Sequence, residues 1–414
     1  MRAESNPHSH PGALLLPTVF VSGAAVLILQ ILGSRLLAPY FGSNLYVWSA
    51  LISVTLLALA LGYWLGGRAA DRVGSPLLLD LVLAAAATLI AGTPLLVHAT
   101  ASRLVELPFE PAILIAAVSY FAPSMFLLGT VSPMAVRMSV PDLGHVGRSV
   151  GSVFGWSTAG GIVGALAAGF VLLPNLAVGQ VCYATAAMLL VLAGGRWATR
   201  RARALGGVAI AGMLVLAGAL AQPSGSAGVR DERGFRILTE KPSFYGAIRV
   251  VEDKRFRYLL IDGSVQAMQT TGGYPIFPYA WTVSLLPYLR PEGRQSLLLG
   301  LGGGDVIRLL KSRGIESTAV ELDAQVAQTA MTYFGLRSTE FRLVIDDGRR
   351  YLRRHPPGVD FIVLDAYTGS CPAMHLFSQE AFAEMKSKLR PGGVLAVNVV
   401  VRSEERRVGK ECRL

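Results

Sequence analysis

Charged residues are scarce in this chain. Asp, Glu, Lys and Arg account for 16% of its 414 residues, whereas hydrophobic residues account for 52%. Soluble globular domains carry roughly 25% charged residues, so this composition excludes a single soluble globule. Cysteine is also rare, and Cys182, Cys371 and Cys412 lack the spacing of a disulfide framework or a zinc site. The six histidines form no HExxH pattern, so we expect no metal site.

Long apolar stretches dominate the first half of the chain. The first six are long enough to cross roughly 30 Å of hydrocarbon, whereas the seventh is marginal. They cover residues 13–34, 45–67, 76–98, 111–136, 150–173, 176–195 and 205–221. Because apolar stretches recur through residue 221, the N-terminus does not act as a cleavable signal before a soluble protein. We therefore predict a multi-pass α-helical membrane domain over residues 1–221.

Two features inside the predicted spans point to packing or function. Small residues recur at helical spacing in the fifth span, Gly151 with Gly155 and Gly160 with Gly164, which predicts close helix packing. Asp80 is the only acid within a span. An ionisable group in hydrocarbon indicates function by default, although its place near one end of the span also allows it to reach the interface.

The second half of the chain has a different pattern. A Pro/Ser/Gly-rich segment begins a linker at 222–234, and alternating apolar and polar residues over 235–266 predict antiparallel strands of a small β subdomain. Strands and helices then alternate over 267–401, which predicts a doubly wound, mainly parallel, Rossmann-like sheet of methyltransferase type. We place strands at 296–300, 316–321, 341–345, 359–365 and 393–400, and helices at 305–313, 324–333, 348–354 and 378–389.

A glycine turn follows the first of these parallel strands. Residues 297–305 read LLLGLGGGD, and Gly300, Gly302, Gly303 and Gly304 allow backbone to approach a ligand closely. An acid at the end of the next strand, about 20 residues on, is typical of ribose binding in α/β folds; here it is Glu321. Asp305 would repel a pyrophosphate but attract a cation, so the pattern favours a sulfonium nucleoside over NAD.

Asp365 ends another apolar strand, FIVLD. If the first and fourth parallel strands are neighbours, Asp365 and Asp305 converge on one cavity at the carboxyl edge of the sheet. The residues also allow structural interpretations. Asp305 can cap a helix, and the pair Asp347–Gly348 is common in turns. We interpret His375 and Cys371 as packing or loop residues.

Together these motifs carry a family resemblance. From about residue 243 to 400 the chain resembles the spermidine synthase (polyamine aminopropyltransferase) family, and its spans resemble the bacterial membrane-fused members. The shared motifs are residues 260–266 (LIDGSVQ), the GGGD loop, 321–323 (ELD), Asp347–Gly348, Asp365 with Pro372 seven residues on, 375–378 (HLFS) and 389–395 (LRPGGVL).

The resemblance implies a site that binds decarboxylated S-adenosylmethionine as cosubstrate, with no prosthetic group. It implies that Asp305 and Asp365 surround the aminopropyl and amine groups, with Asp365 as the proton acceptor. Glu321 is implied at the ribose, and Pro372 at the thioether. The other implied ligands are Asp347 and Gly348 at the adenine, and Gln266 and Tyr279 at the substrate. The implied partners are a small-molecule amine, the lipid bilayer of a bacterial inner membrane and a second copy in a homodimer.

The chain also departs from the family pattern. The family's Ser-x-Tyr-Gln is Ser243-Phe-Tyr-Gly246, its Tyr-His-Glu has Tyr279-Ala-Trp281 as the nearest counterpart, and its second carboxylate is Thr368. The donor half of the site is therefore better preserved than the amine half. Two alternatives stay open: another S-adenosylmethionine-dependent transferase, such as a methyltransferase, and a non-catalytic polyamine or nucleoside sensor coupled to a transporter-like bundle.

The net charge of +11 is concentrated in short loops between spans, so we expect no nucleic-acid partner. Arginines favour the second, fourth and sixth loops, which predicts that these loops and the N-terminus are cytoplasmic. Seven crossings would then place the C-terminal domain outside, whereas an interfacial seventh stretch would place it in the cytoplasm, where nucleoside cosubstrates are supplied. We favour the cytoplasm. Residues 402–414 have no apolar period, and we expect a C-terminally truncated fold with an anomalous tail.

Overall fold

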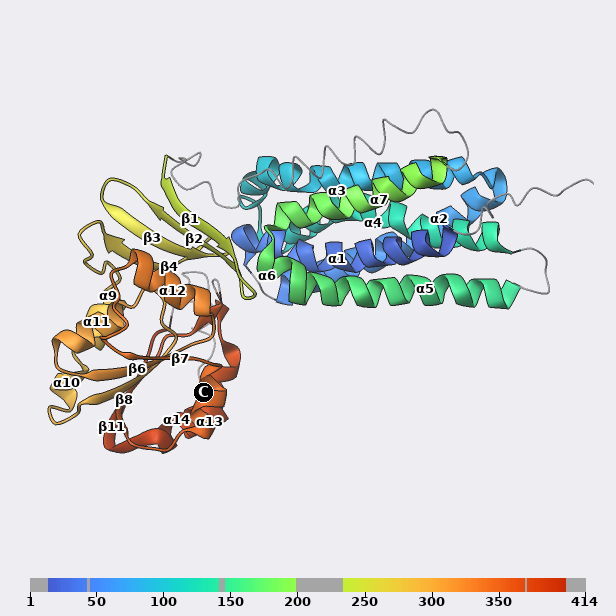
Figure 1. Cartoon of the computed structure of the whole chain (residues 1–414). Helices are drawn as coiled ribbons and strands as arrows, with labels where there is room; N and C mark the ends of the chain where they lie inside the picture. The colour runs from blue at the N-terminus through green and yellow to red at the C-terminus, as the bar shows by residue number, and fades with distance from the viewer. Residues whose placement is uncertain (1–13, 43–44, 141–145, 199–233, 369–370, 400–414) are drawn as a thin grey trace, which may run out of the picture. The chain divides into compact units, whose positions relative to one another are not determined.

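The computed structural model describes residues 14–42, 45–140, 146–198, 234–368 and 371–399. The chain divides into two compact units, Met1–Ser224 and Gly225–Leu414, which Figure 1 shows as a helical part and an α/β part. Each unit has its own buried cores, and we describe each by itself.

The N-terminal unit consists of long apolar helices. They are α1 (Leu15–Phe41), α2 (Leu45–Val73), α3 (Pro76–Leu104), α4 (Phe109–Ser139), α5 (Val146–Ala167) with its continuation η2 (Ala168–Leu172) and α6 (Leu173–Asn175), and α7 (Val178–Ala198). Among the described residues, six helical segments are long and apolar enough to cross a membrane. They coincide with the first six predicted spans. The seventh stretch, 205–221, lies outside the described residues.

Close backbone contacts hold α1 against α5. A Cβ built on Gly160 would lie 1.9 Å from the Phe20 carbonyl oxygen, and one on Gly164 would lie 2.6 Å from the Ala24 carbonyl oxygen. Any larger residue would push the two helices apart, so the packing predicted for this pair is confirmed. The prediction of close packing is wrong for Gly151 and Gly155, because no atom lies within 4 Å of where their Cβ atoms would stand.

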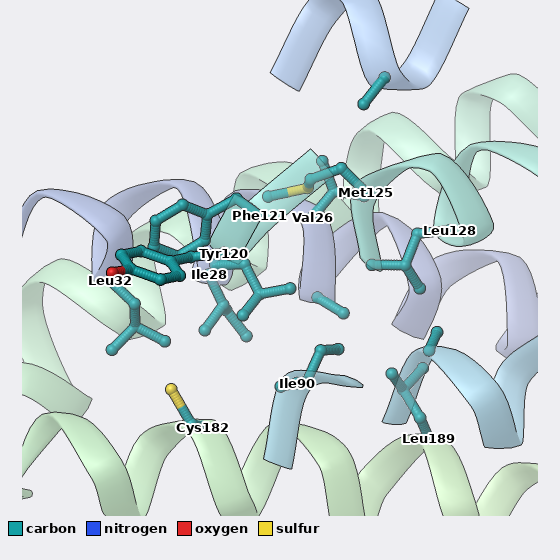
Figure 2. Packing of buried hydrophobic residues seen from close by; sticks show 14 of the residues in the cluster. Val26, Ile28, Leu32, Ile90, Tyr120, Phe121, Met125, Leu128, Cys182 and Leu189 are labelled. Atoms are coloured by element: carbon teal, nitrogen blue, oxygen red, sulfur yellow. The ribbon is translucent and has the colours of Figure 1, made fainter. Parts of the chain in front are cut away.

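A single apolar core fills the interior of the helical unit. Figure 2 shows part of it, with Phe121, Met125 and Leu128 of α4 facing residues of α1, α3 and α7. Asp80 is only 6% exposed. Its side chain is therefore enclosed within the helical unit, and its functional role stays a prediction.

The C-terminal unit begins with a four-stranded antiparallel sheet in chain order, as the alternating pattern predicted. Its strands are β1 (Arg236–Pro242), β2 (Ala247–Glu252), β3 (Phe256–Ile261) and β4 (Ser264–Thr270). Asp262 and Gly263 both have positive φ, +46° and +77°, which gives the tight turn between β3 and β4. The sheet extends to Thr270 rather than ending at residue 266, because β4 pairs with the whole length of β3.

A five-stranded parallel sheet follows, with the order β11-β8-β5-β6-β7. Its strands are β5 (Gln295–Leu299), β6 (Glu316–Glu321), β7 (Arg342–Ile345), β8 (Val359–Leu364) and β11 (Leu389–Val397). The predicted parallel sheet is confirmed, and β5 lies between β6 and β8. The predicted bounds of the last strand, 393–400, are wrong: β11 begins earlier, shifts register between Leu389 and Val394, and ends at Val397.

Helices cover both faces of the parallel sheet. On β5, Leu298 belongs to the core with α11 (Asp305–Ser312) and α12 (Ala324–Tyr333), whereas Leu297 and Leu299 belong to the core with α13 (Gly348–Arg354) and α14 (Gln379–Lys388). This alternation explains why β5 is apolar at three successive positions, Leu297, Leu298 and Leu299. Two short helices, α9 (Pro278–Val283) and α10 (Leu286–Leu289), were not predicted, because they are shorter than the window in which a helical period is visible.

Candidate active site

The glycine turn after β5 brings the loops of β5 and β8 into direct contact. Gly300 has φ +94°, and a Cβ there would lie 2.0 Å from the Asp365 carbonyl oxygen. Gly304 has φ +80° and is the N-cap of α11. A Cβ on Gly303 would lie 2.6 Å from the Ala267 Cβ, so this glycine allows the turn to pack against β4. Gly302 also has a positive φ, +54°.

Glu321 fixes the glycine turn to the end of β6. Its Oε2 accepts a hydrogen bond from the Leu301 N–H at 2.9 Å, and its Oε1 accepts one from the Asp323 N–H at 3.0 Å. Burial raises the pKa of Glu321, while these backbone donors oppose the increase. Each carboxylate oxygen can accept a second bond, so Glu321 can hold the turn and still accept hydrogen bonds from a ligand.

Asp323 and Asp347 are both helix N-caps. Asp323 accepts from the Gln325 N–H at 2.9 Å and from the Ser243 hydroxyl, which ties the loop after β1 to the end of β6. Asp347 caps α13 through the Arg350 N–H at 2.9 Å. Asp347–Gly348 is therefore the start of a helix rather than the turn that the sequence allowed.

The other oxygen of Asp347 contacts His375. The Asp347 Oδ2 to His375 Nε2 distance is 2.8 Å, and His375 lies in η3 (Met374–Leu376). Partial burial favours a higher pKa for Asp347, but the Arg350 N–H and His375 outweigh burial, so the pKa is lowered. Asp347 is consequently an ionised acceptor at neutral pH.

Asp365 lies at the carboxyl edge, one residue beyond the end of β8, and it is partly buried. Its Oδ1 accepts a hydrogen bond from Asn398 Nδ2 at 2.8 Å, and the Tyr279 hydroxyl also donates to it. Burial raises the pKa of Asp365, and the two donors partly offset that increase. Both donors are neutral, so Asp365 keeps a net negative charge when ionised.

The Tyr279 phenol lies close enough to both Asp365 and Asp305 for their charges to affect its pKa. Burial and then the negative charges of Asp365 and Asp305 raise the pKa of the Tyr279 phenol well above its usual value. The hydroxyl therefore stays protonated and remains a donor. Both acids therefore lie close enough to affect one phenol, but Asp305 does not line the pocket that Asp365 lines, so their convergence on one cavity stays a prediction.

Asp305 has a different environment from Asp365. It is 5% exposed in the first turn of α11, and its Oδ1 accepts from Gln269 Nε2 at 2.5 Å and from Arg308 Nη2 at 3.1 Å. Burial raises its pKa, while Gln269 and Arg308 lower it. Gly304, rather than Asp305, caps the helix. The ion pair with Arg308 neutralises part of the charge that the sequence led us to assign to a cationic ligand.

A pocket at the carboxyl edge joins several of these residues. It is lined by predicted site residues Gly300, Gly302, Glu321, Asp347, Gly348, Asp365 and Gln266, together with Asp346, Tyr367 and His375 among others. The predicted residues Gly303, Gly304, Asp305, Tyr279 and Pro372 do not line it. Pro372 lies in β10 (Cys371–Pro372), paired with β9 (Tyr367–Thr368), next to the pocket residue Ala373.

Sequence reasoning missed Asn398 and His375 as site residues. Asn398 follows the apolar run of β11 directly, so it lies at the same edge as Asp365. A polar residue that ends an apolar parallel strand is the signal that would have found it. Within the described ranges, no cluster of three His, Cys, Asp or Glu residues is placed to hold a metal ion.

Comparison with known proteins finds similarity to one protein domain. Residues 281–405 match the family model of the Spermine/spermidine synthase domain. A polyamine aminopropyltransferase from Vibrio vulnificus is 33% identical over 175 residues, covering 39% of this chain and 58% of that protein. An N-terminal histidine N-methyltransferase from Emericella nidulans is 34% identical over 190 residues, covering 40% of this chain and 34% of that protein.

The chain thus spans about a third to about three fifths of these relatives' own lengths. Among solved structures, human Methyltransferase-like protein 13 in complex with SAH is 26% identical, with a TM-score of 0.27, over 32% of this chain and 66% of that chain.

Proposed function

Since the C-terminal unit belongs to the spermine/spermidine synthase family, we propose that this protein is an aminopropyltransferase that uses decarboxylated S-adenosylmethionine and an amine acceptor. The observation that carries the proposal is Asp365, a carboxylate that accepts from two neutral donors and lines the same pocket as Glu321 and Asp347. We further propose that the apolar helices anchor the enzyme in a bacterial inner membrane, with the transferase unit in the cytoplasm.

The reaction needs one base and one oriented donor. The acceptor nitrogen forms a bond to the propyl carbon next to the sulfonium, the carbon–sulfur bond breaks, and its electron pair leaves a neutral thioether. A primary ammonium with a pKa near 10 must lose a proton before or during attack. Asp365 takes that proton in this proposal, and its raised pKa makes it a stronger base than an exposed carboxylate.

The remaining acids position the donor in this proposal. Glu321 accepts from the ribose hydroxyls while it holds the glycine turn, and Asp347 accepts from the adenine amine. Asp305 contributes a partly neutralised negative charge near the aminopropyl ammonium. Holding donor and acceptor in line supplies a large part of the rate enhancement in a group transfer of this kind.

A second candidate function is methyl transfer from ordinary S-adenosylmethionine. The Emericella nidulans relative and the missing amine-side residues favour it. Asp305 and Asp365 oppose it, because the donor's own carboxylate would be repelled by two carboxylates at this edge of the sheet.

The assay that tests the proposal supplies the full-length protein in detergent with labelled decarboxylated or ordinary S-adenosylmethionine and a panel of amines. We expect methylthioadenosine and an aminopropylated amine from the decarboxylated donor alone. Methylated product from the ordinary donor would instead support the second candidate, and release of neither product would contradict both.

The variant Asn398→Ala tests how Asp365 is tuned. Asn398 lowers the pKa of Asp365, so its removal raises that pKa. The ionised carboxylate is the active form, and activity is lost as pH falls through its pKa. The acidic limb of the kcat/KM profile should therefore move to higher pH. Loss of a hydrogen bond to a charged group is worth roughly 1.5–3 kcal/mol, so kcat/KM on the acidic limb should decrease by at least about tenfold.

A pH profile distinguishes this role from a structural one. Activity of Asn398→Ala should recover toward the wild-type plateau at alkaline pH, and Asn175→Ala, in the helical unit, should leave the profile unchanged. An equal loss at every pH would show that Asn398 does not act through the charge of Asp365.

A further inference from the structure

A wide apolar groove runs between α9–α10 and β11. It has a volume of about 910 Å³, within the range of small-molecule sites. Its walls are Tyr279, Thr282, Val283, Leu285, Leu286, Tyr288 and Leu289 on the helices and residues 394–399 on and after β11. No Asp, Glu, Lys, Arg or His is among these lining residues.

The groove is continuous with the proposed base. Tyr279 and Asn398 line it, and these are the two side chains that hydrogen-bond Asp365. Asp365 itself lines the nucleoside pocket. The carboxylate therefore stands between a pocket that fits the donor and a groove that fits an apolar molecule.

The groove does not offer a partner for a second ammonium. The family's second carboxylate is Thr368 in this chain, and the lining side chains carry no negative charge at neutral pH. A cation contacts the helices that line the groove, because Arg313 Nη1 donates to the Tyr288 hydroxyl at 2.7 Å. A diamine would lose the hydration of its far ammonium without compensation.

We propose that the acceptor is a primary amine with a single cationic nitrogen and an apolar tail that lies in this groove. The inference rests on the proposed aminopropyl transfer and names its acceptor class. The ammonium gives one proton to Asp365, and the neutral nitrogen then bonds to the propyl carbon as the carbon–sulfur bond breaks, which leaves a neutral thioether and a secondary ammonium. The tail contacts Leu285, Leu289 and the residues of β11.

Matched pairs of amines test the inference with the full-length protein and decarboxylated S-adenosylmethionine. Butylamine and putrescine differ by one amino group, as do hexylamine and hexamethylenediamine. We expect each monoamine to exceed its diamine in kcat/KM by at least about tenfold. Each buried methylene contributes up to about fourfold, so octylamine should exceed propylamine by at least about thirtyfold.

A charge placed in the groove provides the structural control. Leu289 is 71% exposed, so Leu289→Glu leaves the fold intact. It should lower kcat/KM for octylamine at least about tenfold and change that for propylamine less than about twofold. Gln328→Glu adds the same charge on the exposed surface of α12, away from the groove, and should change neither.

Failure of the inference differs from failure of the proposed function. Preference for diamines, or rates independent of tail length, would overturn the apolar acceptor and leave aminopropyl transfer standing. If another segment of the chain or a second copy fills the groove, the rates will likewise not depend on the length of the amine tail, and the inference is overturned. If no amine is aminopropylated, the proposed function fails, and the acceptor class fails with it.

Discussion

Asp365→Asn is expected to reduce turnover by about a thousandfold while the affinity for the donor changes by less than about threefold. The amide keeps the size of the side chain and can still accept a hydrogen bond from Asn398 or Tyr279. It cannot accept a proton from an amine. Because burial raises the pKa of Asp365, the ionised group is less stable inside the protein than in water, and the variant should be at least as stable as the wild type.

Three measurements on Asp365→Asn separate catalysis from structure. Turnover is measured with labelled decarboxylated donor, donor binding by isothermal titration, and stability by thermal unfolding. Turnover above about a tenth of the wild-type value would exclude Asp365 as the proton acceptor. Loss of donor binding together with turnover would instead give Asp365 a binding role.

Gly300→Ala is expected to destabilise the C-terminal unit by about 3 kcal/mol or more and to abolish donor binding. A non-glycine residue at a left-handed φ loses roughly 1–2 kcal/mol, and overpacking loses a further 1–3 kcal/mol or so. Both effects act at Gly300, which has φ +94° and would place a Cβ 2.0 Å from the Asp365 carbonyl oxygen. The substitution separates the loops of β5 and β8.

Gly314 provides the matched control. It has φ +77°, but no atom lies within 4 Å of where its Cβ would stand. Gly314→Ala should therefore lose only the backbone part, about 1–2 kcal/mol, and retain donor binding. Denaturant unfolding and titration with the donor compare the two variants. Equal losses of stability in the two variants would show that the close contact between the loops of β5 and β8 adds nothing to the destabilisation of Gly300→Ala.

The sequence predicted the parallel sheet and its carboxyl edge well. The apolar pattern of each strand and the alternation of strands and helices along the chain determine both. Leu297, Leu298 and Leu299 are apolar on both faces, and the acids Glu321 and Asp365 end or follow their strands. Parallel strands place such residues at one edge whatever their distance in sequence. The six long apolar helices were predicted for a similar reason, since length and hydropathy define them.

The partners of the site residues were beyond prediction. Asp305 accepts from Gln269, and Asp365 accepts from Asn398 and Tyr279, across sequence distances that no local pattern encodes; the pair of Asp305 with Arg308, three residues on in the same helix, is the exception. The two acids look equivalent in sequence, yet one carries an ion pair and the other has neutral donors. That difference in electrostatics appears only once β4, α9 and β11 are placed around the loops.

The position of Asn398 just after β11 links the chemistry of the site to the outermost strand. Among the described strands, β11 is at the end of the parallel sheet and pairs with β8 alone. Outer strands open more readily than inner ones. When the end of β11 opens, Asp365 loses its hydrogen bond from Asn398. We therefore expect substitutions that speed hydrogen exchange at the end of β11 also to raise the pKa of Asp365.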